Sequence, residues 1–407
     1  MIQRHCVRCD VCKTHHTLRI QMGYGEQYHR FQCHHCGEPI TIELPSERNG
    51  ERAVLIGASS SGPADETSYQ YLSPDFVADE KDAKNPRYFG AFDILDKLME
   101  SPSLQQAIAG DTDPEYHNTS KWFALSDAPS DWDVLQRCWR LERSGRSHLA
   151  AKQLEAFADR NDFESISTWL AVATFTERLF HANDELLSSV IQIKQRFPSE
   201  FDRLVIAYEY EWKTELRDGQ FQVFSEFFKR WVAFSQVYLY VSNGVKMPTI
   251  PTATPIDFEG VRGFYALAQE FFAKQVVLLT ALNNIKAGRQ FDELQHISLN
   301  KYWNTDNARR RDNFASNQIF NAVSAEYDSG LRNAVAHNWI TLRPDGKTLY
   351  YKQGGRGVEV RLAYTSYLFK CMSLFKQICM LIQVEYLLTE AARAAARALL
   401  GPTEDKQ

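Results

Sequence analysis

The chain has 407 residues, 44% of them hydrophobic and 24% charged, which is the composition of an ordinary globular protein with room for two or three domains. Its formal net charge of −5 excludes a general attraction to nucleic acid, so any such binding has to come from a local basic patch. No apolar stretch fits a signal peptide or a membrane span, and a cytoplasmic protein without membrane contact is expected.

Paired cysteines mark the beginning of the chain. Two Cys-x2-Cys pairs, Cys9-Asp-Val-Cys12 and Cys33-His-His-Cys36, lie close to strand-like runs. In a reducing compartment such clustering indicates metal binding rather than disulfides. Two pairs of this kind can complete a tetrahedral zinc shell, and the arrangement resembles a zinc ribbon. The sequence therefore predicts a zinc ribbon at 1–45, with a structural Zn2+ bound by Cys9, Cys12, Cys33 and Cys36.

The ligand set has alternatives. Cys6 and Cys9 form an equally spaced pair, so the first knuckle could be Cys6/Cys9 or Cys9/Cys12, and a neighbouring histidine could replace one thiolate. Four protein ligands leave no position for a substrate, which predicts that the metal stabilises a unit too small to fold alone. The basic side chains of this unit fit a solvated surface as well as a contact with nucleic acid or protein.

Composition divides the remaining chain. Residues 46–68 are polar and turn-rich and are predicted to be a linker, although 53–56 could form a last strand. Residues 69–250 are predicted to be a mainly helical middle region, because apolar residues recur at helical spacing from about residue 131. The proline-rich stretch 247–255 interrupts the helices and is the predicted domain boundary.

A last domain is predicted at 255–400. One long helix is expected from Phe258 to Lys286 and a second from about Asn313 to His337. A β-hairpin, a further strand and a last long helix are expected at 339–351, 358–362 and 364–400. The predicted fold class is mainly α, with a helical C-terminal bundle that carries a β-hairpin insertion and a small N-terminal β zinc ribbon.

The end of the second helix carries residues suited to RNA chemistry. Arg332 and His337 lie five positions apart, a spacing that recurs at 30/35 and 143/148 and indicates little alone. Here it follows an amphipathic helix, with Asn333 one turn before His337 and small alanines between them. RNA carries its own nucleophile, the 2′-hydroxyl, so its cleavage needs a proton carrier and a cation for the phosphate charge. Histidine and arginine supply these two functions.

The segment Leu331-Arg-Asn-Ala-Val-Ala-His-Asn338 resembles the R-N-x3-H signature of HEPN domains, and the resemblance covers about 255–400. It implies a helical, metal-independent endoribonuclease with Arg332, Asn333 and His337 as catalytic residues. It also implies a homodimer or higher homo-oligomer that brings two such sets to one cleft, and a role in anti-phage defence or as a toxin. The strands after the motif depart from the simplest four-helix form of that family.

Basic residues before the motif helix are candidate RNA contacts, although a solvated loop is an equal alternative. They are Arg309, Arg310 and Arg311. A different class of function is a non-catalytic adaptor that binds RNA or protein through the zinc ribbon and the helical domain. A DNA-binding regulator fits less well, because the chain is acidic and lacks a recognisable reader helix.

Overall fold

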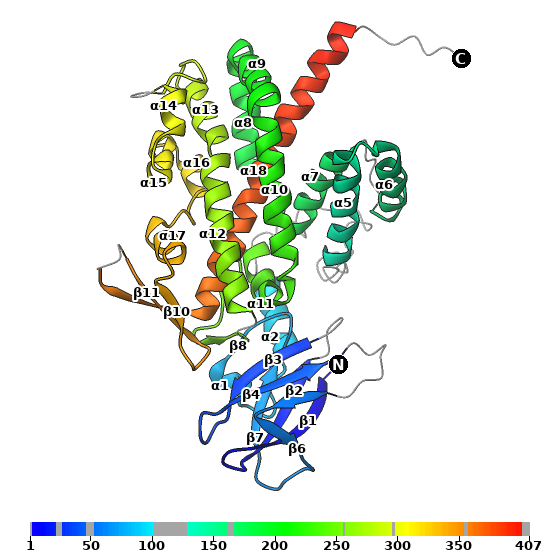
Figure 1. Cartoon of the computed structure of the whole chain (residues 1–407), viewed down its shortest axis with the longest axis vertical. Helices are drawn as coiled ribbons and strands as arrows, with labels where there is room; N and C mark the ends of the chain where they lie inside the picture. Colours follow the sequence, from blue (N-terminus) through cyan, green and yellow to red (C-terminus); the bar gives the residue numbers. More distant parts are fainter. Residues whose placement is uncertain are drawn as a thin grey trace. The chain divides into compact units, whose positions relative to one another are not determined.

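The computed structural model describes two compact units, each assembled from separate stretches of the chain (Figure 1). The first unit draws on Met1–Ser126, Arg230–Tyr265 and Gly330–Ser373, and the second on Asp127–Lys229, Ala266–Ser329 and Leu374–Gln407. The structure describes residues 2–21, 27–45, 53–100, 128–161, 167–254, 257–294, 298–353 and 357–400. The chain is mainly helical with small β-sheets, which confirms the predicted class. The units are not separated at the single predicted boundary near 247–255, because two long helices contribute residues to both.

Two small sheets form the N-terminal part of the first unit. The first has the order β6-β1-β2-β7, where β1 (Ile2–Cys9) and β2 (His15–Gln21) are antiparallel and β7 (Ser68–Leu72) runs parallel to β2. The second consists of β3 (Gln27–Gln32), β4 (Pro39–Leu44) and β5 (Val54–Ile56). Alternating apolar residues of both sheets meet in one core. Its fully buried members include Leu18, Ile20, Ile40 and Ile42.

The segment predicted as a linker differs in its second half. Residues 46–52 lie outside the described residues, but β5 and β6 (Ala58–Ser60) pair with β4 and β1. Between them Gly57 has a φ of +79°, and a Cβ there would come within 2.5 Å of the Pro39 oxygen. Leu55 and Ala58 are the inward side chains of these short strands, whereas Val54 and Ile56 of β5 are exposed although apolar. The strand that the sequence offered at 53–56 is therefore present as β5, and β6 was not predicted.

The rest of the first unit consists of helices, one pair of short strands and a three-stranded sheet. It contains α1 (Glu80–Ala83), α2 (Gly90–Met99), α11 (Trp231–Ser242) and α17 (Ser329–Ala336), with β8 (Ala78–Asp79) paired to β9 (Pro251–Thr252). A three-stranded antiparallel sheet follows α17, with the order β10-β11-β12. Its strands, Ile340–Leu342, Thr348–Lys352 and Glu359–Ala363, lie where the sequence predicts the hairpin and the further strand.

The named elements of the second unit are all helices, and its described residues also include one isolated β-bridge between Glu293 and Ser298. Its first helices are α5 (Ala128–Arg143), α6 (Ser147–Asn161), α7 (Thr168–Leu179), α8 (Asp184–Arg196), α9 (Pro198–Ala207), the π-helix η3 (Tyr208–Trp212) and α10 (Lys213–Phe228). Then come α13 (Val277–Lys286), α14 (Leu299–Trp303), α15 (Asn307–Arg310), the 3-10 helix η4 (Arg311–Phe314) and α16 (Gln318–Ala322). Two long helices, α12 (Phe258–Gln275) and α18 (Tyr364–Leu400), contribute their later residues to this unit. Stacked rings of Phe227 and Phe375, 3.7 Å apart, lie in its core.

The predicted helix from Asn313 to His337 is three shorter elements instead: the end of η4, α16 and α17. Asn317 interrupts it first, because its side chain caps α16 by accepting from the Phe320 amide. Turns at 323–326 interrupt it again before α17 begins. The apolar periodicity predicted one continuous helix, but the polar cap and the turns divide this segment into shorter helices.

A buried carboxyl group connects four helical elements of the second unit. Glu385 of α18 has no exposed surface and accepts hydrogen bonds from the Tyr208 hydroxyl at 3.0 Å, Gln220 Nε2 at 2.6 Å and Gln275 Nε2 at 3.0 Å. These four residues are called the Glu385 cluster below. Burial raises the pKa of Glu385 above its ordinary value, while its hydrogen-bond donors act in the opposite direction.

The segment Tyr364–Ala392 of α18 is long and apolar enough to cross a bilayer, with a mean hydropathy of 1.3, contrary to the expectation that no stretch fits a membrane span. However, 72% of its most apolar stretch is buried within the protein. The core helix of a protein without membrane contact has the same properties, so the segment is weak evidence for a membrane span.

Candidate functional site

Two β-hairpins each end in a cysteine knuckle of the same geometry. In the first, the Cys9 amide donates to the Thr14 oxygen at 3.0 Å and the Lys13 amide to the Cys9 oxygen at 3.1 Å. In the second, the Cys33 amide donates to Glu38 at 2.8 Å and the Gly37 amide to Cys33 at 2.9 Å. Lys13 and Gly37, which follow the second cysteine of each pair, have φ angles of +64° and +75°. This left-handed residue turns the chain so that both thiols of a knuckle point the same way.

The four thiols of the two knuckles meet. The Sγ atoms of Cys9, Cys12, Cys33 and Cys36 all lie within 4.8 Å of one another. The Cys9 and Cys36 sulfurs are 3.7 Å apart, and those of Cys12 and Cys33 are 3.4 Å apart. A tetrahedral ion with metal–sulfur bonds of about 2.3 Å places its sulfur ligands about 3.8 Å apart. The cluster therefore fits one tetrahedral metal ion, as the sequence predicts.

The alternative ligands lie outside this cluster. Cys6 is within β1, in register with Thr17, and belongs to no group of metal-ligating side chains among the described residues. His16 is fully buried with its Nε2 atom 3.3 Å from the Cys33 sulfur. Burial lowers the pKa of His16 to about 4, so its imidazole is neutral at pH 7 and can donate a hydrogen to sulfur. His16 orients a ligand rather than replacing one, a role that its place after the first knuckle did not reveal.

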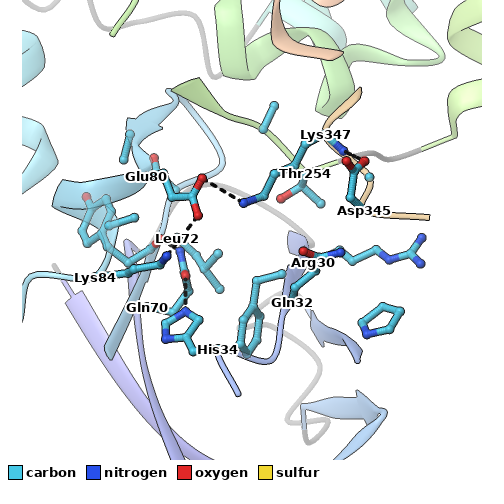
Figure 2. Close-up of a pocket in the computed structure, with 18 of the residues that line it drawn as sticks. Arg30, Gln32, His34, Gln70, Leu72, Glu80, Lys84, Thr254, Asp345 and Lys347 are labelled. Atoms are coloured by element: carbon cyan, nitrogen blue, oxygen red, sulfur yellow. Dashed lines mark hydrogen bonds and ion pairs between the residues drawn. The ribbon is translucent and has the colours of Figure 1, made fainter. Parts of the chain in front are cut away.

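A polar pocket of about 230 Å³ lies beside the second knuckle, within the first unit. Figure 2 shows Glu80 of α1 between two ammonium groups, Lys84 at 3.0 Å and Lys347 from the β10–β11 turn at 3.1 Å. His34 points to Gln70, with 3.1 Å between Nε2 and Oε1. Burial lowers the pKa of His34, and the two lysines lower it further. In this pocket Glu80 is thus paired with both lysines, and the pKa of His34 lies below its ordinary value although the hydrogen bond to Gln70 acts in the opposite direction.

The predicted catalytic residues lie in α17, in the case of Arg332 and Asn333, and directly after it, in the case of His337. Leu331, Ala334 and Val335 are buried and anchor the helix. His337 follows the last helical residue and is exposed, whereas Arg332 and Asn333 are half-buried. The apolar positions of the segment therefore hold it to the core and leave the motif residues at the surface.

A Schellman motif ends this helix. The Trp339 amide donates to the Ala334 oxygen at 2.8 Å and the Asn338 amide to the Val335 oxygen at 3.2 Å. Asn338 has a φ of +56°, a conformation that asparagine and glycine tolerate best. The cap stops the helix at the histidine, so the imidazole lies at the open end of α17.

Two side-chain contacts order the motif. Arg332 Nη1 donates to Asn333 Oδ1 at 2.8 Å. The His337 ring lies against Trp339, with 4.7 Å between ring centroids and 30° between planes. Arg332 and Asn333 are thus in direct contact, and His337 has an aromatic neighbour that the sequence analysis did not include in the site. The alternation of inward and outward side chains in the strand that follows was the signal that could have identified Trp339 as an outward-facing residue next to His337.

The three candidate RNA-binding arginines have different environments. Arg309 is exposed. Arg310 is only 7% exposed and donates to the backbone oxygens of Ala273 and Trp303 at 2.9 and 3.1 Å. Arg311 donates to Asn321 Oδ1 at 2.6 and 3.0 Å. The predicted RNA contact is therefore wrong for Arg310, because its guanidinium is used inside the fold, and of the three only Arg309 is exposed.

Replacement of Arg310 and of Arg309 distinguishes a structural arginine from an exposed one. We expect Arg310→Ala to lower the free energy of unfolding by about 2–3 kcal/mol, because two buried carbonyl oxygens lose a charged donor. Arg309→Ala, the exposed neighbour, should change it by less than about 0.5 kcal/mol. Urea unfolding followed by circular dichroism measures both, and equal stabilities would contradict the assigned structural role.

Comparison of the chain with protein-family models, with curated proteins and with solved structures finds no match.

Proposed function

We propose that the chain is a metal-independent endoribonuclease of the HEPN type, whose C-terminal helices and β-hairpin insertion form a HEPN-like domain. Arg332, Asn333 and His337 are the proposed catalytic residues. The observation that supports this best is that α17 and its cap carry all three residues: Arg332 contacts Asn333 in the middle of this eight-residue helix, and exposed His337 follows its last residue.

The proposed reaction needs only these side chains and the substrate. The 2′-oxygen attacks the adjacent phosphorus and loses its proton to a base, while the P–O5′ bond breaks and the 5′-oxygen gains a proton. His337 carries protons in this scheme, and Arg332 stabilises the additional negative charge on the phosphoryl oxygens. Asn333 positions the guanidinium through the contact described above. The products are a 2′,3′-cyclic phosphate and a 5′-hydroxyl.

Cleavage of total RNA by wild-type protein and by His337→Ala tests the proposal. The matched control is His148→Ala, because Arg143 and His148 have the same sequence spacing and His148 is exposed on the second unit. Wild type and control should cleave, and His337→Ala should not. Equal activity of all three proteins would refute the assignment.

The proposed metal is Zn2+, bound by Cys9, Cys12, Cys33 and Cys36 in a structural role. Four thiolates are the donors of structural zinc sites and leave no position for a substrate. The chemistry assigned to His337 does not involve this ion.

Metal analysis should return about one zinc per chain for the wild type. Cys33→Ser should lose the metal and unfold the N-terminal sheets, because their knuckles lose a common centre, while the helices of the second unit persist. Cys6→Ser is the control, since Cys6 lies outside the cluster, and should keep the metal. Plasma mass spectrometry and protease digestion provide the measurements. An unchanged zinc content in Cys33→Ser would contradict the ligand assignment.

Further expectations follow from the HEPN resemblance. One Arg/His set per chain implies a homodimer or higher homo-oligomer in which two sets share a cleft, and light scattering should give at least twice the chain mass. A strictly monomeric protein that cleaves RNA would refute the shared cleft. A cytoplasmic role in anti-phage defence or as a toxin is part of the same proposal.

The second candidate function is a non-catalytic adaptor that binds RNA or protein. The exposed aromatic ring of Trp339 beside the motif favours binding as well as cleavage. RNA that binds with unchanged length after long incubation would support this candidate over the ribonuclease.

A further inference from the structure

The sheet β10-β11-β12 has two unlike faces. Its register aligns Thr341 with Tyr350 and Tyr350 with Arg361, and the side chains of such neighbours lie on one face. The opposite face carries buried apolar residues, among them Ile340, Leu349 and Tyr351. Because strand side chains alternate, the first face is turned away from this core. It is called the Tyr350 face here and includes Trp339, Thr341, Arg343, Tyr350, Lys352 and Arg361, with Glu359 as the direct cross-strand neighbour of Lys352.

Trp339 belongs to this face although it precedes β10. The Lys352 amide donates to the Trp339 oxygen at 3.3 Å, which continues the ladder by one residue. Trp339 is 38% exposed and lies against the His337 ring. The Tyr350 face therefore begins at the proposed catalytic histidine and continues across three strands.

Cations and aromatic rings are interleaved on this face. The Arg343 guanidinium lies 4.1 Å from the centroid of the Tyr350 ring, and Arg361 is the direct cross-strand neighbour of Tyr350. Arg343, Lys352 and Arg361 are exposed, and Glu359, which lies on the same face opposite Lys352, is the one acidic residue of the three strands. A chain with a net charge of −5 thus has a local excess of positive charge beside His337.

We propose that the Tyr350 face binds single-stranded RNA, with bases stacked on Trp339 and Tyr350 and phosphates bound by Arg343, Lys352 and Arg361. Trp339 is exposed and Tyr350 is half-buried, and accessible rings of this kind accept unpaired bases, whereas a duplex keeps its base faces stacked inside the helix. Because the Tyr350 face begins next to His337, a strand bound on this face has a phosphate near the imidazole. This orientation of the substrate depends on the proposed ribonuclease function, but the binding itself does not.

The test measures binding without cleavage. A fluorescent 12-nucleotide RNA with 2′-O-methyl groups cannot supply the nucleophile, so anisotropy reports affinity alone. Tyr350→Ala should weaken binding about 10-fold, the effect of losing one stacked base. Arg361→Ala should weaken binding and reduce the salt dependence by about 0.7 in log Kd against log salt, as expected for one phosphate contact on a single strand.

Two variants provide matched controls. Tyr210 is 87% exposed and Arg146 is exposed, both on the second unit, so Tyr210→Ala and Arg146→Ala should bind as the wild type does. A duplex of the same sequence should bind more weakly than the single strand. Arg361 is exposed, so its replacement should leave the unfolding midpoint unchanged and keep the test valid if Tyr350→Ala folds poorly.

The outcomes separate this proposal from the ribonuclease function. Loss of binding in Arg361→Ala with retained binding in His337→Ala supports the Tyr350 face, even if the wild type cleaves no RNA. Wild-type affinity in both Tyr350→Ala and Arg361→Ala would overturn it, even if cleavage by His337 is established. Tighter binding of the duplex would also overturn it, because the bases of a duplex are already stacked on one another and cannot stack on Trp339 or Tyr350.

Discussion

Glu385→Ala is expected to lower the free energy of unfolding by about 3–5 kcal/mol, because buried donors from three other helical elements lose their common acceptor. Tyr208, Gln220 and Gln275 have no water to replace the carboxyl oxygens, since Glu385 is fully buried. Urea unfolding followed by circular dichroism measures the loss. A change below about 1 kcal/mol would show that the Glu385 cluster does not hold these helices together.

Glu385→Gln is the matched control. Its amide oxygen can accept from both glutamines, and the Tyr208 hydroxyl can rotate to accept from the new amide nitrogen. The variant keeps the shape of the cluster and removes the titratable proton. We therefore expect its stability to remain within about 1 kcal/mol of the wild type near the pH at which Glu385 is protonated.

The pH dependence has a defined sign. Burial raises the pKa of Glu385 in the folded protein above its ordinary value, so the folded state binds the proton more tightly than the unfolded state. This contribution is complete below the ordinary pKa and disappears as the pH rises through the folded-state pKa. Glu385→Gln lacks it, so the stability of the variant relative to the wild type should increase with pH. The opposite trend would show that the hydrogen-bond donors outweigh burial.

Arg332→Ala and His337→Ala are each expected to reduce RNA cleavage by at least ~100-fold, the usual effect of losing a charge stabiliser or a catalytic acid–base. Neither change should unfold the protein, because Arg332 is half-buried and His337 exposed on an anchored helix. Single-turnover rates on a defined RNA provide the measurement. Asn338→Gly is a suitable control, since glycine adopts the same positive φ and preserves the cap.

The chemistry of the product ends decides the mechanism. Attack by the 2′-hydroxyl leaves a 2′,3′-cyclic phosphate and should proceed in EDTA during short incubations that leave the cysteine cluster intact. RNA with 2′-deoxy or 2′-O-methyl sugar at the cut site should not react, because the nucleophile is missing. Magnesium dependence with 5′-phosphate products would instead identify a metal-dependent nuclease and exclude His337 as the proton carrier of this scheme.

The sequence was most informative where one physical constraint decides the local structure. Thiol chemistry and the two-residue spacing were sufficient to predict the cluster of Cys9, Cys12, Cys33 and Cys36. Alternation and a Pro-Asp-Gly turn predicted β10 and β11 nearly to the residue. The roles of His16 and Arg310 were not predictable, because each depends on partners brought close by the fold, a thiol on another hairpin and backbone oxygens of other helices.

Long-range organisation was also beyond the sequence. Proline content indicated a break near 247–255, but α12 and α18 each contribute to both units. Helical periodicity shows which face of a helix is apolar, but it does not show whether one helix belongs to one compact unit or to two. The candidate site was predictable as a motif, whereas Trp339 and the Tyr350 face required the register of three strands.

The cap of α17 also restricts which sequences could carry this site. Asn338 occupies a left-handed position that excludes β-branched residues and favours asparagine or glycine. An Arg-Asn-x3-His pattern on a helix that continues past its histidine would keep the imidazole in mid-helix, away from an open end. Searches for proteins with this surface should therefore require asparagine or glycine directly after the histidine and an aromatic residue next, a filter that discards most chance occurrences of the shorter pattern.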